Sequence, residues 1–109
     1  MSPRSVCDRL RDVLEAIDRA IDFASVDRDE LRVAAVLYEL IVIGEAVGGL
    51  PDDVLSSYED APKRAIVGMR NLAAHEYHRV DAAFVWGTVD DDLPSLRLAV
   101  EQERTRLGC

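Results

Sequence analysis

The stretch ELRVAAVLYELIVIGEAV, residues 30 to 47, decides the fold, because it is long enough for a helix and apolar on nearly every side. A surface helix carries one apolar stripe, whereas a helix that is apolar all round is packed by neighbours on several sides. Asp27 followed by Glu30 resembles a capping box at its start, and Gly48-Gly49 is typical of its end. The pattern predicts the central helix of a bundle.

The segment before it predicts an amphipathic helix. From Ser5 to about Phe23, apolar residues recur at spacings of three and four, at Val6, Leu10, Val13, Leu14, Ile17 and Ile21. Ala24 to Arg28 breaks this pattern and predicts the turn that connects the two helices.

The segments after the central helix open with residues suited to helix starts. Pro51 suits the first turn of a short segment that reaches Tyr58, and Ala61-Pro62 suits the start of the helix that follows. Asp81 is placed to cap a segment from Ala82 to about Val89.

The last helix is expected after Asp90-Asp91-Asp92, whose charges favour the positive end of a helix, and it carries Leu93, Leu96, Leu98, Val100 and Leu107. No stretch alternates in the manner of a β-strand. We therefore expect one all-α domain over residues 1–109, an up-and-down bundle of about five helices.

Composition excludes several classes of protein. With 49% hydrophobic and 31% charged residues over 109 positions, the chain is globular rather than disordered. Glu39 and Glu45 interrupt the longest apolar run, so no membrane span is expected, and the charged first turns lack the apolar core of a signal peptide. Cys7 and Cys109 lie at opposite ends without a metal-ligand spacing, which favours reduced thiols and a cytoplasmic protein.

The charge distribution singles out one region. The net charge of −8 argues against indiscriminate binding of polyanions. Between residues 63 and 79, however, there are four cationic residues and one anionic residue, Glu76. The net charge of this stretch is +3, and that of the remainder is −11. The cations are Lys63, Arg64, Arg70 and Arg79. Such a local basic island suits an anionic ligand bound at one place, although solvated helix charges would give the same count.

The stretch GMRNLAAHEYHR, residues 68 to 79, concentrates polar chemistry on this island. On a helix Arg70 and Tyr77 share one stripe, and Asn71 and His75 share the next, so the four side chains can open onto one surface. Arg offers a fork of donors that matches phosphate oxygens, and His exchanges protons near neutral pH. This combination is suited to cleaving RNA without a metal or other cofactor.

Other interpretations of the same residues stay open. Taken alone, an Arg and a His five apart are commonly surface residues, and a metal site from His75, Glu76 and His78 lacks further ligands at a recognised spacing. Glu45, next to Gly44 on the apolar helix, is expected either to pair with Arg70 or another cation or to be a partly exposed carboxylate at the helix end.

Residues 70 to 77, RNLAAHEY, resemble the Arg, four to six residues, His, any residue, Tyr motif of the HepT-like proteins, which belong to the HEPN superfamily of small helical ribonucleases. The resemblance extends along most of the chain, through IGEA at 43–46, LP at 50–51, VGM at 67–69 and DLPSL at 92–96.

This resemblance implies a metal-independent endoribonuclease, the toxin of a prokaryotic toxin–antitoxin pair. It implies that Arg70 and His75 are catalytic, that Asn71 supports them, and that Tyr77 accepts AMP from a minimal nucleotidyltransferase (MntA-like) antitoxin. It also implies a homodimer in which two motifs meet across a cleft.

Two alternatives belong to other classes. In the first alternative, the protein is a catalytically silent module that binds a nucleotidyltransferase through the motif. In the second, it is an ordinary helical dimer in which Arg70, Asn71 and His75 make structural hydrogen bonds. A nuclease assay separates the first from the toxin, and loss of the dimer in His75→Ala would support the second.

Overall fold

The computed structural model describes residues 2–59, 63–68, 70–71 and 80–109, and these contain helices and turns but no strand. The elements are α1 (Pro3–Ala24), α2 (Glu30–Gly48), α4 (Ala82–Gly87), the π-helical turn η2 (Thr88–Asp92) and α5 (Leu93–Leu107). Residues 63–68 and 70–71 are helical as well. The all-α class expected from the sequence is confirmed.

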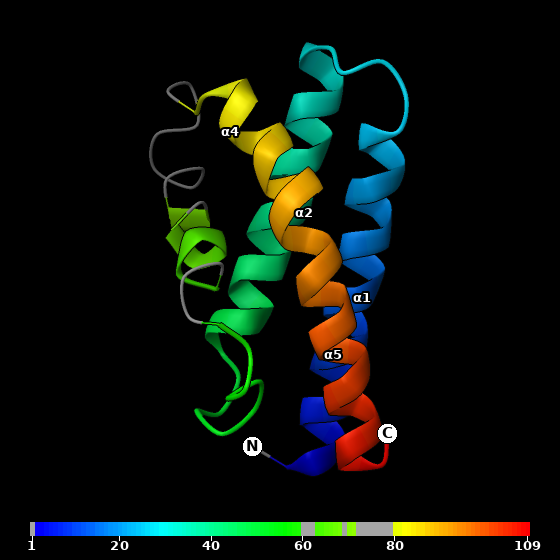
Figure 1. The fold of residues 1–109 in the computed structure, drawn as a ribbon, viewed down its shortest axis with the longest axis vertical. Coiled ribbons are helices and arrows are strands. Elements are labelled where there is room, and N and C mark those ends of the chain that lie inside the picture. Colours follow the sequence, from blue (N-terminus) through cyan, green and yellow to red (C-terminus); the bar gives the residue numbers. More distant parts are fainter. Residues whose placement is uncertain (1, 60–62, 69, 72–79) are drawn as a thin grey trace.

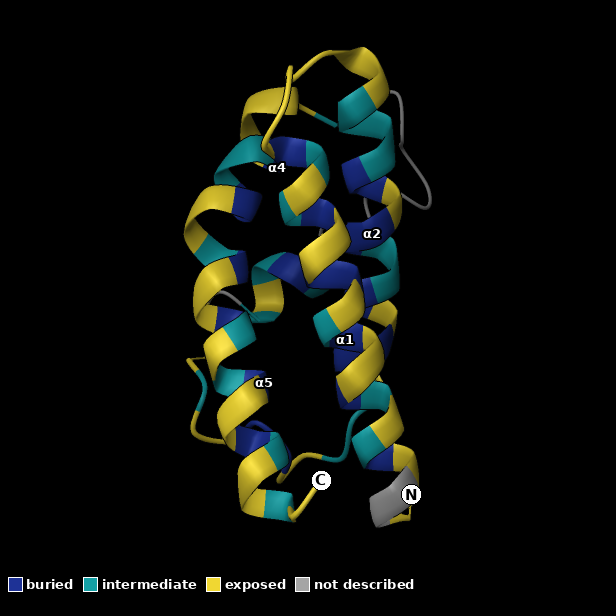
Figure 2. Ribbon diagram, turned by 90° about the vertical axis from the view of Figure 1, so that its right-hand side faces the viewer, coloured by how far each residue is buried: buried dark blue, intermediate teal, exposed yellow. Residues whose placement is uncertain are grey.

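The helices run up and down along the long axis of a molecule that measures 39 × 27 × 21 Å (Figure 1). α1 packs against α2 and α5, and the two ends of the chain lie at the same end of the bundle. Buried residues line the sides of α1, α2 and α5 that face the interior (Figure 2). The largest fully buried side chains include Leu10, Ile17, Leu40, Ile43, Ile66, Leu93 and Leu96.

The N-cap of helix α2 lies two residues after the expected one. Asp29, not Asp27, is the N-cap, and its carboxylate accepts a hydrogen bond from the Arg32 N–H at 2.9 Å. The expectation of a capping box with Asp27 is therefore wrong, because the nearer Asp satisfies the free N–H groups of the first turn.

A buried ion pair joins α1 to α2. Glu39 is 2% exposed, and both of its carboxylate oxygens accept from the Nε of Arg19 at 2.9 Å. The apolar helix thus contains a charge that is matched from the neighbouring helix, as buried charges require.

Helices α4 and α5 form one continuous helix through the π turn. Asp81 caps α4 as expected, accepting from the Ala83 N–H at 2.9 Å. α5 begins at Leu93, directly after Asp90–Asp92 as expected, although Asp92 makes no side-chain cap. The Leu93 N–H donates instead to the Thr88 carbonyl five residues earlier, a widening that accommodates the missing N–H and the ring of Pro94.

Asp90, which was expected to favour a helix start, pairs with another segment. Its two oxygens accept from Arg28 at 2.9 and 2.7 Å, and the Arg28 guanidinium lies 4.9 Å from the centre of the Trp86 ring. This pairing holds η2 and α4 against the turn that connects α1 to α2.

Residues 51–58 form successive turns, in place of the helix-like segment expected after Pro51. Val54 donates to the Pro51 carbonyl and Tyr58 to the Leu55 carbonyl. Leu55 has a positive φ of 61° and is buried, and its N–H donates to the carboxylate of Glu103 on α5. A side chain from α5 therefore holds this segment in a conformation that local sequence disfavours.

One side of α2 is uncovered in the single chain. Leu31 is 74% and Tyr38 is 64% exposed, seven residues apart on the same face. The expected packing on several sides is present, since α1, α4 and the stretch that carries Arg70 all contact α2, and this one side stays exposed. None of the helices among the described residues is long and apolar enough to cross a bilayer.

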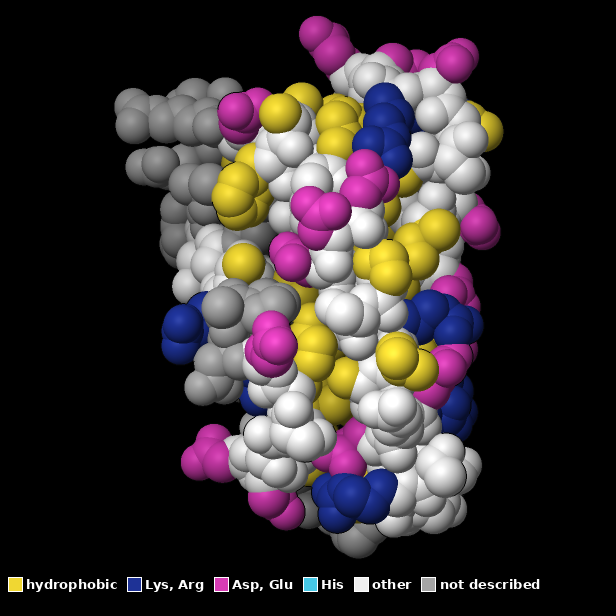
Figure 3. All heavy atoms as spheres, in the orientation of Figure 1, with side chains coloured by type: hydrophobic (Ala, Val, Ile, Leu, Met, Phe, Trp, Pro, Cys, Tyr) yellow, Lys and Arg dark blue, Asp and Glu magenta, His cyan; other side chains and the backbone are white. Residues whose placement is uncertain are grey.

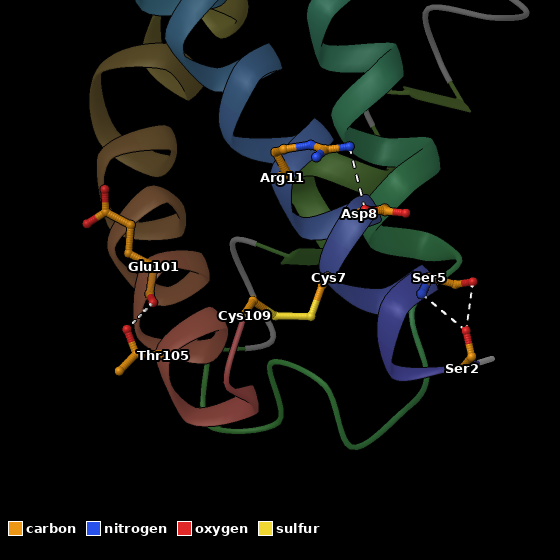
Figure 4. The surroundings of a disulfide bond; sticks show 8 residues. All are labelled: Ser2, Ser5, Cys7, Asp8, Arg11, Glu101, Thr105 and Cys109. Atoms are coloured by element: carbon orange, nitrogen blue, oxygen red, sulfur yellow. Dashed lines mark hydrogen bonds and ion pairs between the residues drawn. A yellow bond between two sulfur atoms is a disulfide. The ribbon is translucent and has the colours of Figure 1, made fainter.

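The two cysteines are joined by a disulfide, with 5.8 Å between their Cα atoms (Figure 4). Gly108 adopts a left-handed conformation that turns the last residue back toward α1, and the Cys109 N–H donates to the Arg104 carbonyl at 2.9 Å. The expectation of reduced thiols is wrong, because residues at opposite ends of the sequence meet when α1 and α5 pack antiparallel.

Candidate functional site

The described part of the site is built on the helical stretch that carries Arg70 and Asn71, which lies beside α2 (Figure 1). Gly44 of α2 makes the approach possible. A Cβ added at Gly44 would lie 2.5 Å from the Cβ of Arg70 and 3.2 Å from the Ile66 carbonyl oxygen. Only a residue without a side chain lets the two helices come this close.

Arg70 is held at both ends of its side chain. Its Cβ and Cγ rest on Gly44, and its Nη1 lies 3.5 Å from Oε1 of Glu45. The Arg70 side chain is 29% exposed and that of Glu45 is 64% exposed. The pair anticipated between these two residues is confirmed, and Glu45 is at the same time an exposed carboxylate near the end of α2.

The tip of Arg70 retains donors for a ligand. Its Nε is buried, and no atom of the described residues accepts a hydrogen bond from it. Arg cannot lose its proton under ordinary conditions, so the guanidinium is a fixed positive charge that can bind a phosphate oxygen. Asn71, next to it in the chain, is exposed and offers an amide to the same surroundings.

Acidic and basic side chains lie on different elements around the pair formed by Arg70 and Glu45. On one side, a groove between α1 and α2 is lined by three carboxylates and one guanidinium, those of Asp8, Asp12, Glu45 and Arg9. On the other side, the stretch that carries Arg70 also holds Lys63 and the exposed Arg64. Over the face in Figure 3, acidic and basic side chains are interspersed. The cations suited to an anionic ligand thus lie on the stretch that carries Arg70.

The other expected site residues lie outside the described residues. These are His75 and Tyr77, together with Glu76, His78 and Arg79. The structure therefore places Arg70 and Asn71 and leaves the proposed acid–base and modification residues as predictions.

The close approach of the two helices occurs at Gly44. A Cβ added there would collide with Arg70, whereas one at Gly68 would meet no atom of the described residues within 4 Å. The signal for Gly44 was present, because a glycine inside an apolar helix costs about 1 kcal/mol relative to Ala and so calls for a packing reason.

Comparison with known proteins adds an independent result. The sequence model of a family described as "Ribonuclease HepT-like" matches residues 6–103. The chain is 36% identical over 107 residues to "Probable ribonuclease HepT" of Thermococcus cleftensis, covering 93% of this chain and 97% of that protein. It is 32% identical over 107 residues to a "Putative RNase" of Methanocaldococcus jannaschii, covering 93% and 98%. No solved structure matches the chain significantly.

Proposed function

Because this chain belongs to the family of HepT-like ribonucleases, we propose that it is a metal-independent endoribonuclease that cleaves RNA with Arg70 and His75. The observation that carries the proposal is the Arg70 side chain, a permanent cation whose stem is fixed against α2, on a stretch that also carries Lys63 and Arg64. Such a group is suited to stabilising the extra negative charge of a phosphorane.

The proposed reaction uses the ribose itself as nucleophile. His75 takes the proton of the 2′-hydroxyl, and the 2′-oxygen attacks the adjacent phosphorus. The bond from phosphorus to the 5′-oxygen breaks, and that oxygen leaves as a hydroxyl after receiving a proton. The products are a 2′,3′-cyclic phosphate and a 5′-hydroxyl end, and Asn71 assists by orienting the phosphate or the imidazole.

The nuclease assay compares the wild-type protein with Arg70→Ala and His75→Ala. We expect both variants to retain their helical circular dichroism spectrum and to lose RNA cleavage, because they remove charge or proton transfer rather than apolar volume. Cleavage should continue in the presence of a chelator. Wild-type protein that cleaves only when magnesium is supplied would contradict the mechanism, and wild-type protein that cleaves nothing would favour the silent binding module.

We further propose that the protein is the toxin of a toxin–antitoxin pair that acts on RNA in the cytoplasm and is neutralised at Tyr77. A nucleotidyltransferase antitoxin would join the Tyr77 oxygen to the α-phosphorus of ATP, with loss of the hydroxyl proton and release of pyrophosphate. The added phosphodiester would be held beside a cation suited to phosphate, at a far higher effective concentration than RNA.

Mass spectrometry after co-expression with the adjacent nucleotidyltransferase tests this control. One or more AMP groups are expected on the peptide that contains Tyr77, and none on that peptide in Tyr77→Phe. Neutralisation without any change in mass would show that the antitoxin acts by binding and that the role assigned to Tyr77 is wrong.

The proposal includes a homodimer. Its support is the uncovered side of α2, where Leu31 and Tyr38 are exposed. Closed twofold dimers are the commonest assemblies, and two basic islands form a stronger RNA site than one. Light scattering should give twice the mass of the chain at micromolar concentration, and a monomer there would contradict the dimer.

A further inference from the structure

Glu45 lies where a carboxylate is locally unfavourable. It is in the last turn of α2, which contains no basic residue, and the end of a helix carries partial negative charge. A carboxylate there is disfavoured unless a cation compensates it. The cation is Arg70, whose Nη1 is 3.5 Å from Oε1 of Glu45.

The remainder of Arg70 is positioned without Glu45. Gly44 and the Ile66 carbonyl fix where its Cβ and Cγ lie, and its Nε is buried. These contacts restrain the stem, and the ion pair with Glu45 restrains the rotation of the guanidinium plane. Because the guanidinium is a planar fork, that rotation sets which N–H groups face a bound phosphate.

The ion pair contributes little to folding. The carboxylate is 64% exposed and the separation is long for a hydrogen bond, and water and salt screen exposed pairs of this kind. Its loss should therefore leave the fold intact and alter the direction of the guanidinium.

We propose that Glu45 is a positioning residue, which holds the guanidinium of Arg70 in the orientation that stabilises the transition state. The proposal rests on the proposed function of Arg70. Small misplacements of such a group cost up to about a hundredfold in rate, because the stabilising contact exists only at the reacting geometry.

The kinetic test uses Glu45→Ala and Glu45→Gln on a short RNA, with Glu101→Ala as the matched control. Glu101 also pairs with an arginine, Arg97, and is exposed on α5. We expect Glu45→Ala to lower kcat about tenfold or more with KM changed by less than about threefold, because positioning acts in the transition state. Glu45→Gln keeps the shape of the side chain and an oxygen beside Nη1 but loses the charge, so it should recover only part of the lost kcat, and Glu101→Ala should match wild type.

Two kinetic outcomes would overturn the proposal. Unchanged kcat in Glu45→Ala would show that the stem contacts suffice. A lower KM with unchanged kcat in both variants would show that Glu45 competes with the phosphate for Arg70 instead of orienting it.

A spectroscopic test separates this proposal from the proposed function. The ¹⁵N relaxation of the Arg70 Nε–H, assigned by its absence in Arg70→Lys, reports how rigidly the guanidinium is held. We expect this N–H to become more mobile in Glu45→Ala and not in Glu101→Ala, whether or not the protein cleaves RNA. Equal mobility in all three proteins would contradict the positioning role, while loss of cleavage in the wild type would contradict only the nuclease.

Discussion

At the scale of single residues, Glu103 holds a backbone conformation that the local sequence does not favour. It is 7% exposed and accepts hydrogen bonds from the Leu55 N–H and from Arg106. Leu55 is a non-glycine residue with positive φ, and it lies in a turn, where no regular helical hydrogen bond is available to its N–H. The carboxylate therefore satisfies a buried donor and restrains the turns after α2.

The first prediction concerns the pH dependence of this contact. The hydrogen bond from Arg106 lowers the pKa of Glu103, and the Leu55 N–H lowers it further. A lowered folded-state pKa means that the ionised carboxylate stabilises the fold above the unfolded-state pKa of about 4.3, and that this stability is lost as the pH falls through the lower folded-state value. We expect Glu103→Gln to be less stable than wild type by about 1–3 kcal/mol at neutral pH, since hydrogen bonds to charged groups have that strength.

Urea denaturation at a series of pH values measures the difference. The difference in the free energy of unfolding between wild type and Glu103→Gln should become smaller as the pH falls below about 4. Glu101→Gln, in an exposed pair on the same helix, serves as the control and should cost less than about 1 kcal/mol. A gap that does not change with pH would contradict the role of the charge.

At the scale of elements, the contact between α2 and the stretch that carries Arg70 depends on one missing side chain. Gly44 touches Arg70 where a Cβ would lie 2.5 Å from another Cβ, a separation that real Cβ atoms essentially never show. Since the opposing atom belongs to the base of a side chain, the backbone of one helix has to move to relieve the collision.

The second prediction follows from that collision. Gly44→Ala should destabilise the protein by about 1–3 kcal/mol, as overpacking does, even though Ala is the better helix former. It should also slow RNA cleavage, because Arg70 is displaced from α2.

Gly48→Ala is the matched control for this experiment. It lies on the same helix, and its added Cβ would meet Val67 Cγ2 at an ordinary 3.9 Å. Chemical denaturation measures the free energy of unfolding of both variants, and a cleavage assay measures their rates on RNA. If Gly44→Ala is as stable and as active as Gly48→Ala, the close contact does not position Arg70.

At the scale of the whole molecule, the disulfide ties the start of α1 to the end of α5. It spans 102 positions in the sequence and encloses nearly the entire chain. The ion pair between Arg97 and Asp18, 2.8 Å apart, also joins these helices, but its carboxylate is half exposed. The covalent link is therefore the strongest restraint on how the two helices dock.

The third prediction is that this link contributes a large share of the stability. Closing a loop of about 100 residues lowers the entropy of the unfolded chain by the equivalent of about 4.7 kcal/mol, and measured contributions are usually about 2–4 kcal/mol. The double variant Cys7→Ser, Cys109→Ser should lose an amount in this range when unfolded by urea.

Reduction of the wild type should reproduce that loss. Dithiothreitol should lower the denaturation midpoint of the wild-type protein and leave that of the double variant unchanged. Equal midpoints for oxidised and reduced wild type would show that the packing of α1 and α5 suffices without the link.

The sequence alone determined the features that depend on neighbouring residues. The spacing of Val6, Leu10 and Val13 requires a helix with one buried side, and Asp81 followed by apolar residues requires a capped helix start, because side chains three or four apart share a helix face. The family to which the chain belongs could likewise be inferred from the motif at residues 70–77, since a short motif is made of residues that are close together in the sequence.

Tertiary structure decided the features that join residues far apart in the chain. Gly44 meets Arg70, Leu55 meets Glu103, and Cys7 meets Cys109. No local pattern specifies these partners, because each depends on how whole helices pack against one another and on their relative positions along the bundle axis. That arrangement is set by the shared packing of many side chains in the core, and a periodicity only states which side of a helix is buried, not what covers it.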